Sequence, residues 1–175
     1  METLLRSRPL VLVSLIGAAA LLRLLPHPDN FVPIGAMALF AGAKLDDRRA
    51  AFAVPLLAML LSDLFIGFHP TLPFVYLCFA LTVPMGFGLR TQAGPMVAAS
   101  AASSVLFYGV TNFAHWALTN YWPHDGAGLL GCYIAGLPYL GRTLASTAFY
   151  ASVLFGGLAL LERRIPTLAP RPVLR

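Results

Sequence analysis

Two apolar runs that fold back on each other constrain this chain more than any other feature. Residues 60–81 read LLSDLFIGFHPTLPFVYLCFAL, and His69-Pro70 marks the turn between the runs. The first run carries a carboxylate, Asp63, and the second carries a thiol, Cys78. At a helical rise of ~1.5 Å per residue, both groups lie roughly 8–12 Å from the turn, at a similar depth of a membrane. Because an ionisable side chain is costly to bury in hydrocarbon, we expect the two groups to mark a functional site.

The composition predicts an integral membrane protein. Of 175 residues, 58% are hydrophobic and 11% are charged, and the mean hydropathy is +0.76. This leaves too little polar surface to cover a water-soluble globule. The net charge of +5 does not indicate a nucleic-acid partner, because the basic residues are not clustered on a polar helix. The two cysteines form no CxxC or zinc-binding pattern.

Hydrophobic runs and the residues that interrupt them predict a single all-α transmembrane domain over residues 1–175. Six membrane-spanning helices are expected, at about residues 9–25, 31–43, 50–68, 71–89, 95–119 and 142–161. The first run also fits a signal peptide, because Arg6 and Arg8 precede it. The second run is short, so it is either wrapped mostly in protein or enters the bilayer obliquely. Glycines and prolines interrupt residues 121–141, which predicts a long outer loop and a candidate lid.

Basic residues predict the orientation of this six-helix arrangement. With both termini in the cytoplasm, only Arg23 and Arg142 of the 12 Lys and Arg residues are external, which agrees with the positive-inside rule. The cytoplasmic ones are Arg6, Arg8, Lys44, Arg48, Arg49, Arg90, Arg163, Arg164, Arg171 and Arg175. In this orientation the outer half of the bundle is rich in histidine, amide and aromatic side chains.

That surplus of polar and aromatic side chains predicts a ligand cavity open to the outside. The candidate binding residues are Cys78, Asp63, His27, His69, Asn112, His115, Trp116, Tyr121, Trp122 and Arg142. Other interpretations of the same residues stay open. The aromatic residues are typical of a belt at the membrane interface, and Cys78 is typical of a small buried residue. Asp63 also fits a structural carboxylate, with Arg142 as its preferred partner and Arg23 as the alternative.

The sequence lacks the motifs of several enzyme and pump classes. It has no GxxxxGK[ST] phosphate loop, no GxSxG and no HExxH. Asp63 is essentially the only charged residue inside the apolar runs, which is too few for an ion-coupled pump with several titrating sites. The pattern favours a binding and translocation subunit that has no energy source of its own.

Four segments of the chain resemble a known family. These are PDNFVPIGAMALFAGA, AFAVPLLAMLLSDLFIGFHPTLPFVYLCFAL, LFYGVTNFAHWAL and GLLGCYIAGLPYLGRTL. They resemble small bacterial membrane proteins related to the S components of energy-coupling-factor vitamin transporters. The resemblance implies a multi-pass protein of the bacterial cytoplasmic membrane that binds a vitamin near its outer face and docks on an energy-coupling ATPase module. The docking feature, small residues four apart on the first helix, is present only as Ser14 and Ala18, so a solitary protein is the alternative.

Within that family, the chain resembles the solitary cobalamin transporters of the BtuM type. This resemblance implies that Cys78 ligates the cobalt of a bound cobalamin, with His27, His69 and His115 as competing imidazole ligands. No intrinsic cofactor is expected, and Cys132 gives no indication of a role. Three other functions stay open. They are an S component for another small vitamin or precursor, a structural subunit, and a membrane-embedded thiol enzyme that acts on its ligand. Removal of the upper axial cyanide of a bound corrinoid would be a side chemistry of the cobalamin transporter.

Overall fold

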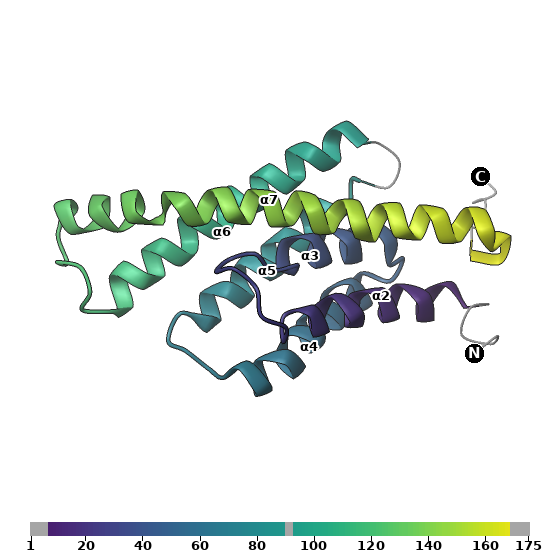
Figure 1. The fold of residues 1–175 in the computed structure, drawn as a ribbon, viewed down its shortest axis with the longest axis horizontal. Helices are drawn as coiled ribbons and strands as arrows, with labels where there is room; N and C mark the ends of the chain where they lie inside the picture. The colour runs from purple at the N-terminus through teal and green to yellow at the C-terminus, as the bar shows by residue number, and fades with distance from the viewer. Residues whose placement is uncertain (1–6, 90–92, 169–175) are drawn as a thin grey trace.

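The computed structural model describes residues 7–89 and 93–168, and every regular element there is helical. In chain order the elements are α2 (Arg8–Leu22), α3 (Ile34–Lys44), α4 (Arg48–Ile66), α5 (Leu72–Gly86), α6 (Ala93–Leu118), α7 (Gly126–Arg164) and a short 3-10 turn, η1 (Pro166–Leu168) (Figure 1). The all-α expectation is confirmed for these residues. The predicted bounds of the first five helices agree with α2 to α6 to within a few residues.

Successive helices run in opposite directions, so the start of α2 and the end of α7 lie at the same end of the bundle, which we call the terminal end (Figure 1). The α3–α4 link, the end of α5 and the start of α6 also lie at this end, and the α2–α3, α4–α5 and α6–α7 links lie at the opposite end. We call the α2–α3 link, residues 23–33, the strap. Four of the basic residues used to predict the orientation lie outside the described residues. They are Arg6, Arg90, Arg171 and Arg175.

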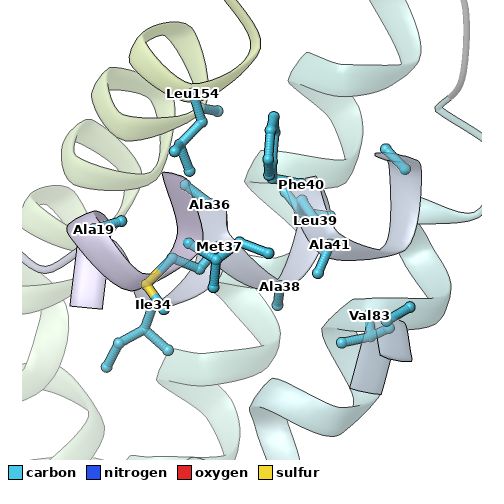
Figure 2. Packing of buried hydrophobic residues seen from close by; sticks show 14 of the residues in the cluster. Ala19, Ile34, Ala36, Met37, Ala38, Leu39, Phe40, Ala41, Val83 and Leu154 are labelled. Carbon is cyan, nitrogen blue, oxygen red and sulfur yellow. The ribbon is translucent and has the colours of Figure 1, made fainter. Parts of the chain in front are cut away.

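Helix α3 is the centre of the bundle. It packs against each of the other five α-helices, and its residues from Ala36 to Ala43 are all buried. Figure 2 shows its side chains pointing to several sides, with Ala19 of α2, Val83 of α5 and Leu154 of α7 among its neighbours. A helix that is apolar all round must be enclosed by other helices or by lipid. Of the two interpretations offered for this short run, the structure supports a helix wrapped in protein.

Two glycines allow α3 and α5 to touch through their backbones. A Cβ atom at Gly42 would lie 2.1 Å from the carbonyl oxygen of Val83, and one at Gly86 would lie 2.4 Å from that of Leu39. No larger residue fits at these distances without moving a backbone, so the close approach requires glycine at both positions. The contact fixes how α5 lies along the central helix.

Short polar residues and one glycine determine where the helices begin and end. Asp47 caps α4 by accepting a hydrogen bond from the amide of Arg49 at 3.0 Å, and Asp125 caps α7 by accepting one from the amide of Gly128 at 2.7 Å. Gly67 ends α4 with a φ of 102°, a conformation that glycine adopts at little cost. These residues set the lengths of the two helices that they bound.

Three of the described helices are long and apolar enough to cross a membrane. They are α4, the segment Gly94–Leu118 of α6, and α7. The expectation of six spans is not supported, because α2, α3 and α5 are shorter apolar helices. The 11 residues of α3 extend about 16 Å, roughly half the thickness of a bilayer's hydrocarbon core. Large apolar side chains are exposed on the outer surface, among them Leu61, Phe65, Val97 and Phe149, which is compatible with a membrane protein.

The expected outer loop at residues 121–141 is wrong for most of its length. Residues from Gly126 onward belong to α7, a continuous helix of 39 residues that contains Pro138. The glycines of this segment serve close packing and do not break the helix. A Cβ at Gly136 would lie 2.4 Å from the side-chain oxygen of Asn112 on α6, and one at Gly131 would lie 2.9 Å from the ring of Trp122. The loop between α6 and α7 is therefore short.

The α3–α5 contact predicts that Gly42→Ala destabilises the protein by about 1–3 kcal/mol, the usual range for an overpacked core. The new methyl group would meet the backbone of α5, which cannot rotate away as a side chain can. Thermal unfolding of the purified protein in detergent measures the effect. Gly157→Ala is the matched control, because no atom lies within 4 Å of a Cβ at that position. A Gly42→Ala protein as stable as Gly157→Ala would contradict the account of the contact.

Candidate functional site

A small cavity lies at the strap end of α3, and Cys78 forms part of its wall. The lining residues come from the strap and four helices. They are Asn30, Val32, Ile34, Gly35, Cys78, Phe79, Thr82, Ser103, Ser104, Phe107, Thr143 and Thr147. The Cys78 side chain is buried, with 2% of its surface exposed. Of the ten predicted binding residues, Cys78 is the one that lines this cavity.

The cavity is small and partly open. Its volume is about 20 Å³, enough for one or two water molecules. Gly35 forms part of the tightest wall, since a Cβ there would lie 3.0 Å from the hydroxyl oxygen of Thr147 and 3.6 Å from that of Ser103. A larger organic ligand therefore needs the wall to move.

The strap closes one side of the cavity and is held against α7. Phe31 packs against both Phe149 and Tyr150, with ring centroids 6.0 and 5.8 Å away. The hydroxyl of Ser146 lies 3.4 Å from the carbonyl oxygen of Asn30, but its single hydrogen has a shorter acceptor in the carbonyl of Thr143, at 3.0 Å. Asn30 has a φ of 61°, a left-handed conformation that asparagine tolerates better than most residues. The strap, and not residues 121–141, is the segment placed to act as a lid.

Asp63 belongs to a buried ion-pair network and not to the cavity. Its carboxylate accepts hydrogen bonds from the guanidinium of Arg23 at 2.6 Å and from the hydroxyl of Tyr76 at 2.8 Å, and 1% of its surface is exposed. The preferred partner, Arg142, is wrong, and the alternative, Arg23, is observed. The reason is packing: Arg23 directly follows α2, and α2 packs against α4, which carries Asp63.

Three of the other predicted residues lie at the surface near the strap end. Arg142 approaches the exposed carboxylate of Asp29, 3.8 Å away. His27 lies within 3.0 Å of the carbonyl oxygen of Pro28. His69 lies 2.9 Å from the hydroxyl of Thr71. Each of these partners is local to the surface, so the three side chains do not contribute to the cavity wall.

The remaining five predicted residues lie in the α6–α7 hairpin. They are Asn112, His115, Trp116, Tyr121 and Trp122. The indole of Trp116 donates to the carbonyl of Pro123 at 2.9 Å, the rings of His115 and Tyr121 are 6.0 Å apart, and those of Tyr121 and Trp122 are 6.1 Å apart. Asn112 donates to the carbonyl of Tyr108 at 2.8 Å. These contacts hold the hairpin together and do not reach the cavity.

The second cysteine also lies in this hairpin. The thiol of Cys132 donates to the carbonyl of Asn112 at 3.4 Å, and the side chain is buried. Both cysteines are free. Because Cys132 does not line the cavity, it provides a matched thiol control for Cys78.

The sequence interpretation missed the hydroxyl side chains of the wall. They occur as small polar residues four positions apart within apolar helices, such as Cys78 with Thr82 and Thr143 with Thr147. Residues four apart lie on one face of a helix, so these two faces of α5 and α7, together with Ser103 and Ser104 of α6, make a polar cavity. Each pair on its own is also typical of ordinary helix packing, and only the fold shows that they converge.

Comparison with known proteins gives a family but no assigned activity. The chain matches a family described as "Family of unknown function (DUF6580)" over residues 3–168, and it therefore belongs to this family. No curated protein and no solved structure matches the chain. The geometry of the cavity is thus the basis for interpreting its function.

The buried ion pair predicts that Asp63→Leu destabilises the protein by about 3–5 kcal/mol, because Arg23 is left buried without its counter-charge. The double variant Arg23→Leu/Asp63→Leu should recover most of this loss, since neither charge then remains. Chemical unfolding in detergent measures both. As a control, Arg142→Leu should change stability little, because its pair with Asp29 is exposed. An Asp63→Leu protein of wild-type stability would show that the network does not support the fold.

Proposed function

We propose that this member of the DUF6580 family is a membrane protein that binds a small organic molecule, a vitamin or a vitamin precursor, in the cavity at Cys78 and carries it across the bilayer. One observation carries the proposal. Hydroxyl, amide and thiol side chains from the strap, α5, α6 and α7 converge on one cavity inside an otherwise apolar bundle. Ligand sites combine mainly apolar walls with a few convergent polar groups in this way.

The placement of the strap supports a route into the cavity. Asn30 and Val32 of the strap and Thr143 and Phe107 of the helices are half-buried, whereas the deeper wall is buried. Helices α5, α6 and α7 are held by packing along their lengths, but the strap is held to α7 by few contacts. Movement of strap residues 27–32, which leaves the buried Arg23–Asp63 pair in place, is therefore the least costly way to admit a ligand.

The proposed orientation places the strap outside the cell. The bundle is embedded in a bacterial cytoplasmic membrane, and both termini are cytoplasmic. Among the described residues, Arg8, Lys44, Arg48, Arg49, Arg163 and Arg164 lie at or next to helix ends at the terminal end of the bundle. A cysteine introduced at Ala127 should then react with a membrane-impermeant maleimide in intact cells, and reaction only after permeabilisation would reverse the orientation.

An energy-coupling ATPase module is part of the proposal as a partner, with solitary action as the alternative. Ser14 and Ala18 are exposed on α2, so the surface that the resemblance associates with docking is free in this chain. Small residues spaced by four allow the close approach of a second helix.

Cobalamin is the second candidate ligand, and the position of Cys78 favours it. Among the described residues of the wall, the thiol is the one soft ligand, and none is a histidine. A thiolate is a competent ligand for a soft transition-metal centre. A corrinoid is far larger than the cavity, so binding it would require α6 and α7 to separate from α3 and α5 as well as movement of the strap.

The strap account predicts that Phe31→Ala increases the alkylation rate of Cys78 by N-ethylmaleimide in detergent-solubilised protein. Removing the ring releases the strap from Phe149 and Tyr150 and exposes the thiol more often. A Cys132→Ser background ensures that one thiol is followed by mass spectrometry. Phe113→Ala is the control, because Phe113 packs on Trp116 in the hairpin. Equal rates in Phe31→Ala and Phe113→Ala would remove the strap from the access route.

The cobalamin assignment is tested with hydroxocobalamin and the purified protein. Ligation of cobalt by the sulfur of Cys78 should change the corrinoid absorption spectrum and protect Cys78 from alkylation. Cys78→Ser should abolish the spectral change, whereas Cys132→Ser should retain it. If hydroxocobalamin leaves both the spectrum and the alkylation rate unchanged in the wild type, cobalamin is excluded and the smaller vitamin or precursor remains the proposed ligand.

A further inference from the structure

The hydroxyl groups of the cavity wall define what a ligand must offer. Five of them line the cavity: Thr82, Ser103, Ser104, Thr143 and Thr147. A hydroxyl group has a single hydrogen to donate and two lone pairs to accept hydrogen bonds. The direction of each hydrogen therefore decides whether the wall presents donors or acceptors to the cavity.

Four of these hydrogens are used within the helices. The hydroxyls of Thr82, Ser103, Ser104 and Thr143 donate to carbonyl oxygens one turn earlier in the same helix, at 2.8, 3.0, 2.8 and 2.9 Å. The remaining hydroxyl, that of Thr147, lies 3.3 Å from the oxygen of Ser104. At this distance the contact is longer than a normal O–H···O hydrogen bond, and Ser104 already donates its hydrogen to a carbonyl. Four of the five oxygens therefore offer the cavity lone pairs alone, and Thr147 is the one hydroxyl that keeps a hydrogen to donate.

The rest of the lining adds no charge. Among the described residues of the wall there is no Asp, Glu, Lys, Arg or His, and Cys78 contributes a weak donor. Asn30, at the half-buried edge, has an amide that both donates and accepts hydrogen bonds. An anion would face lone pairs without a counter-charge, and a cation would be buried without a carboxylate.

We infer that the cavity takes an uncharged organic molecule that presents N–H or O–H donors to the hydroxyl oxygens of α5, α6 and α7. Its apolar part lies against Phe79 and Phe107, the two aromatic side chains of the lining. This inference rests on the proposed function and narrows the class of its ligand. Carboxylates and phosphates are excluded from the class, and so are neutral molecules that only accept hydrogen bonds.

Three small aromatic probes of similar shape test the inference. Benzamide is neutral and has N–H donors, N,N-dimethylbenzamide is neutral and has none, and benzoate is an anion. Each is added at millimolar concentration to the Cys132→Ser protein in lipid nanodiscs, and the alkylation rate of Cys78 is followed. Benzamide should slow alkylation, and it should do so at lower concentration than the other two probes.

A pair of matched variants assigns the effect to the wall. Thr82→Val removes a hydroxyl from the cavity with almost no change in shape, and it should weaken protection by benzamide about 2- to 10-fold, the effect of one hydrogen bond. Thr111→Val is the control. Thr111 also donates to a carbonyl one turn earlier, at 2.7 Å, but it does not line the cavity, so protection should match that of the parent protein.

The outcomes separate the inference from the function on which it rests. Protection by benzoate or N,N-dimethylbenzamide at the same concentration as benzamide overturns the donor requirement and leaves a binding cavity in place. Equal protection of Thr82→Val and Thr111→Val by benzamide overturns the role of the hydroxyl wall. Absence of protection by all three probes overturns both the ligand class and the proposed cavity.

Discussion

The backbone contact between α3 and α5 at Gly42 and Gly86 is the constraint on which the rest of the structure depends. Gly86, Thr82 and Cys78 are spaced by four and share one face of α5. On α3, Gly42 and Gly35 are seven residues apart and also share a face. The two helices run in opposite directions (Figure 1), so they touch at the Gly42–Gly86 end. At the other end Gly35 and Cys78 both line the cavity, where side chains of α6 and α7 replace the backbone contact.

Two ion pairs outside the cavity hold helix α2 in place. At one end of α2, Arg23 pairs with Asp63 at 2.6 Å. At the other end, Arg8 pairs with Glu162 of α7 at 2.5 Å. A buried pair contributes little net stability compared with apolar residues, but it strongly disfavours arrangements in which one charge is left unpaired. The two pairs therefore fix the position of α2, and the intramembrane carboxylate that first suggested a ligand site has a structural role.

Much of the fold follows from the hydrophobic pattern of the sequence. The cavity, in contrast, depends on side chains from several segments that meet only in the folded protein. The first five helices were predictable because length and apolar composition act locally, whereas the enclosed position of α3 was one of two interpretations that its short apolar run allowed. The helix at residues 126–141 was not predictable, because Gly131 and Gly136 disfavour a helix in isolation and become favourable only against α6. The sequence predicted that Cys78 and Asp63 lie at a similar depth of the membrane and mark one site. Depth along a helix does not determine the direction in which a side chain points. Cys78 faces the cavity and Asp63 faces Arg23.

Native mass spectrometry of the protein released directly from its membrane tests the central claim, that this cavity holds a small molecule. The account predicts a bound, uncharged organic species on the wild-type protein. It also predicts loss of this species in Gly35→Leu, whose side chain would occupy the wall near Thr147, and its retention in Gly157→Leu. A bound species present equally in both variants, or a wild-type protein that carries only lipid, would contradict the account.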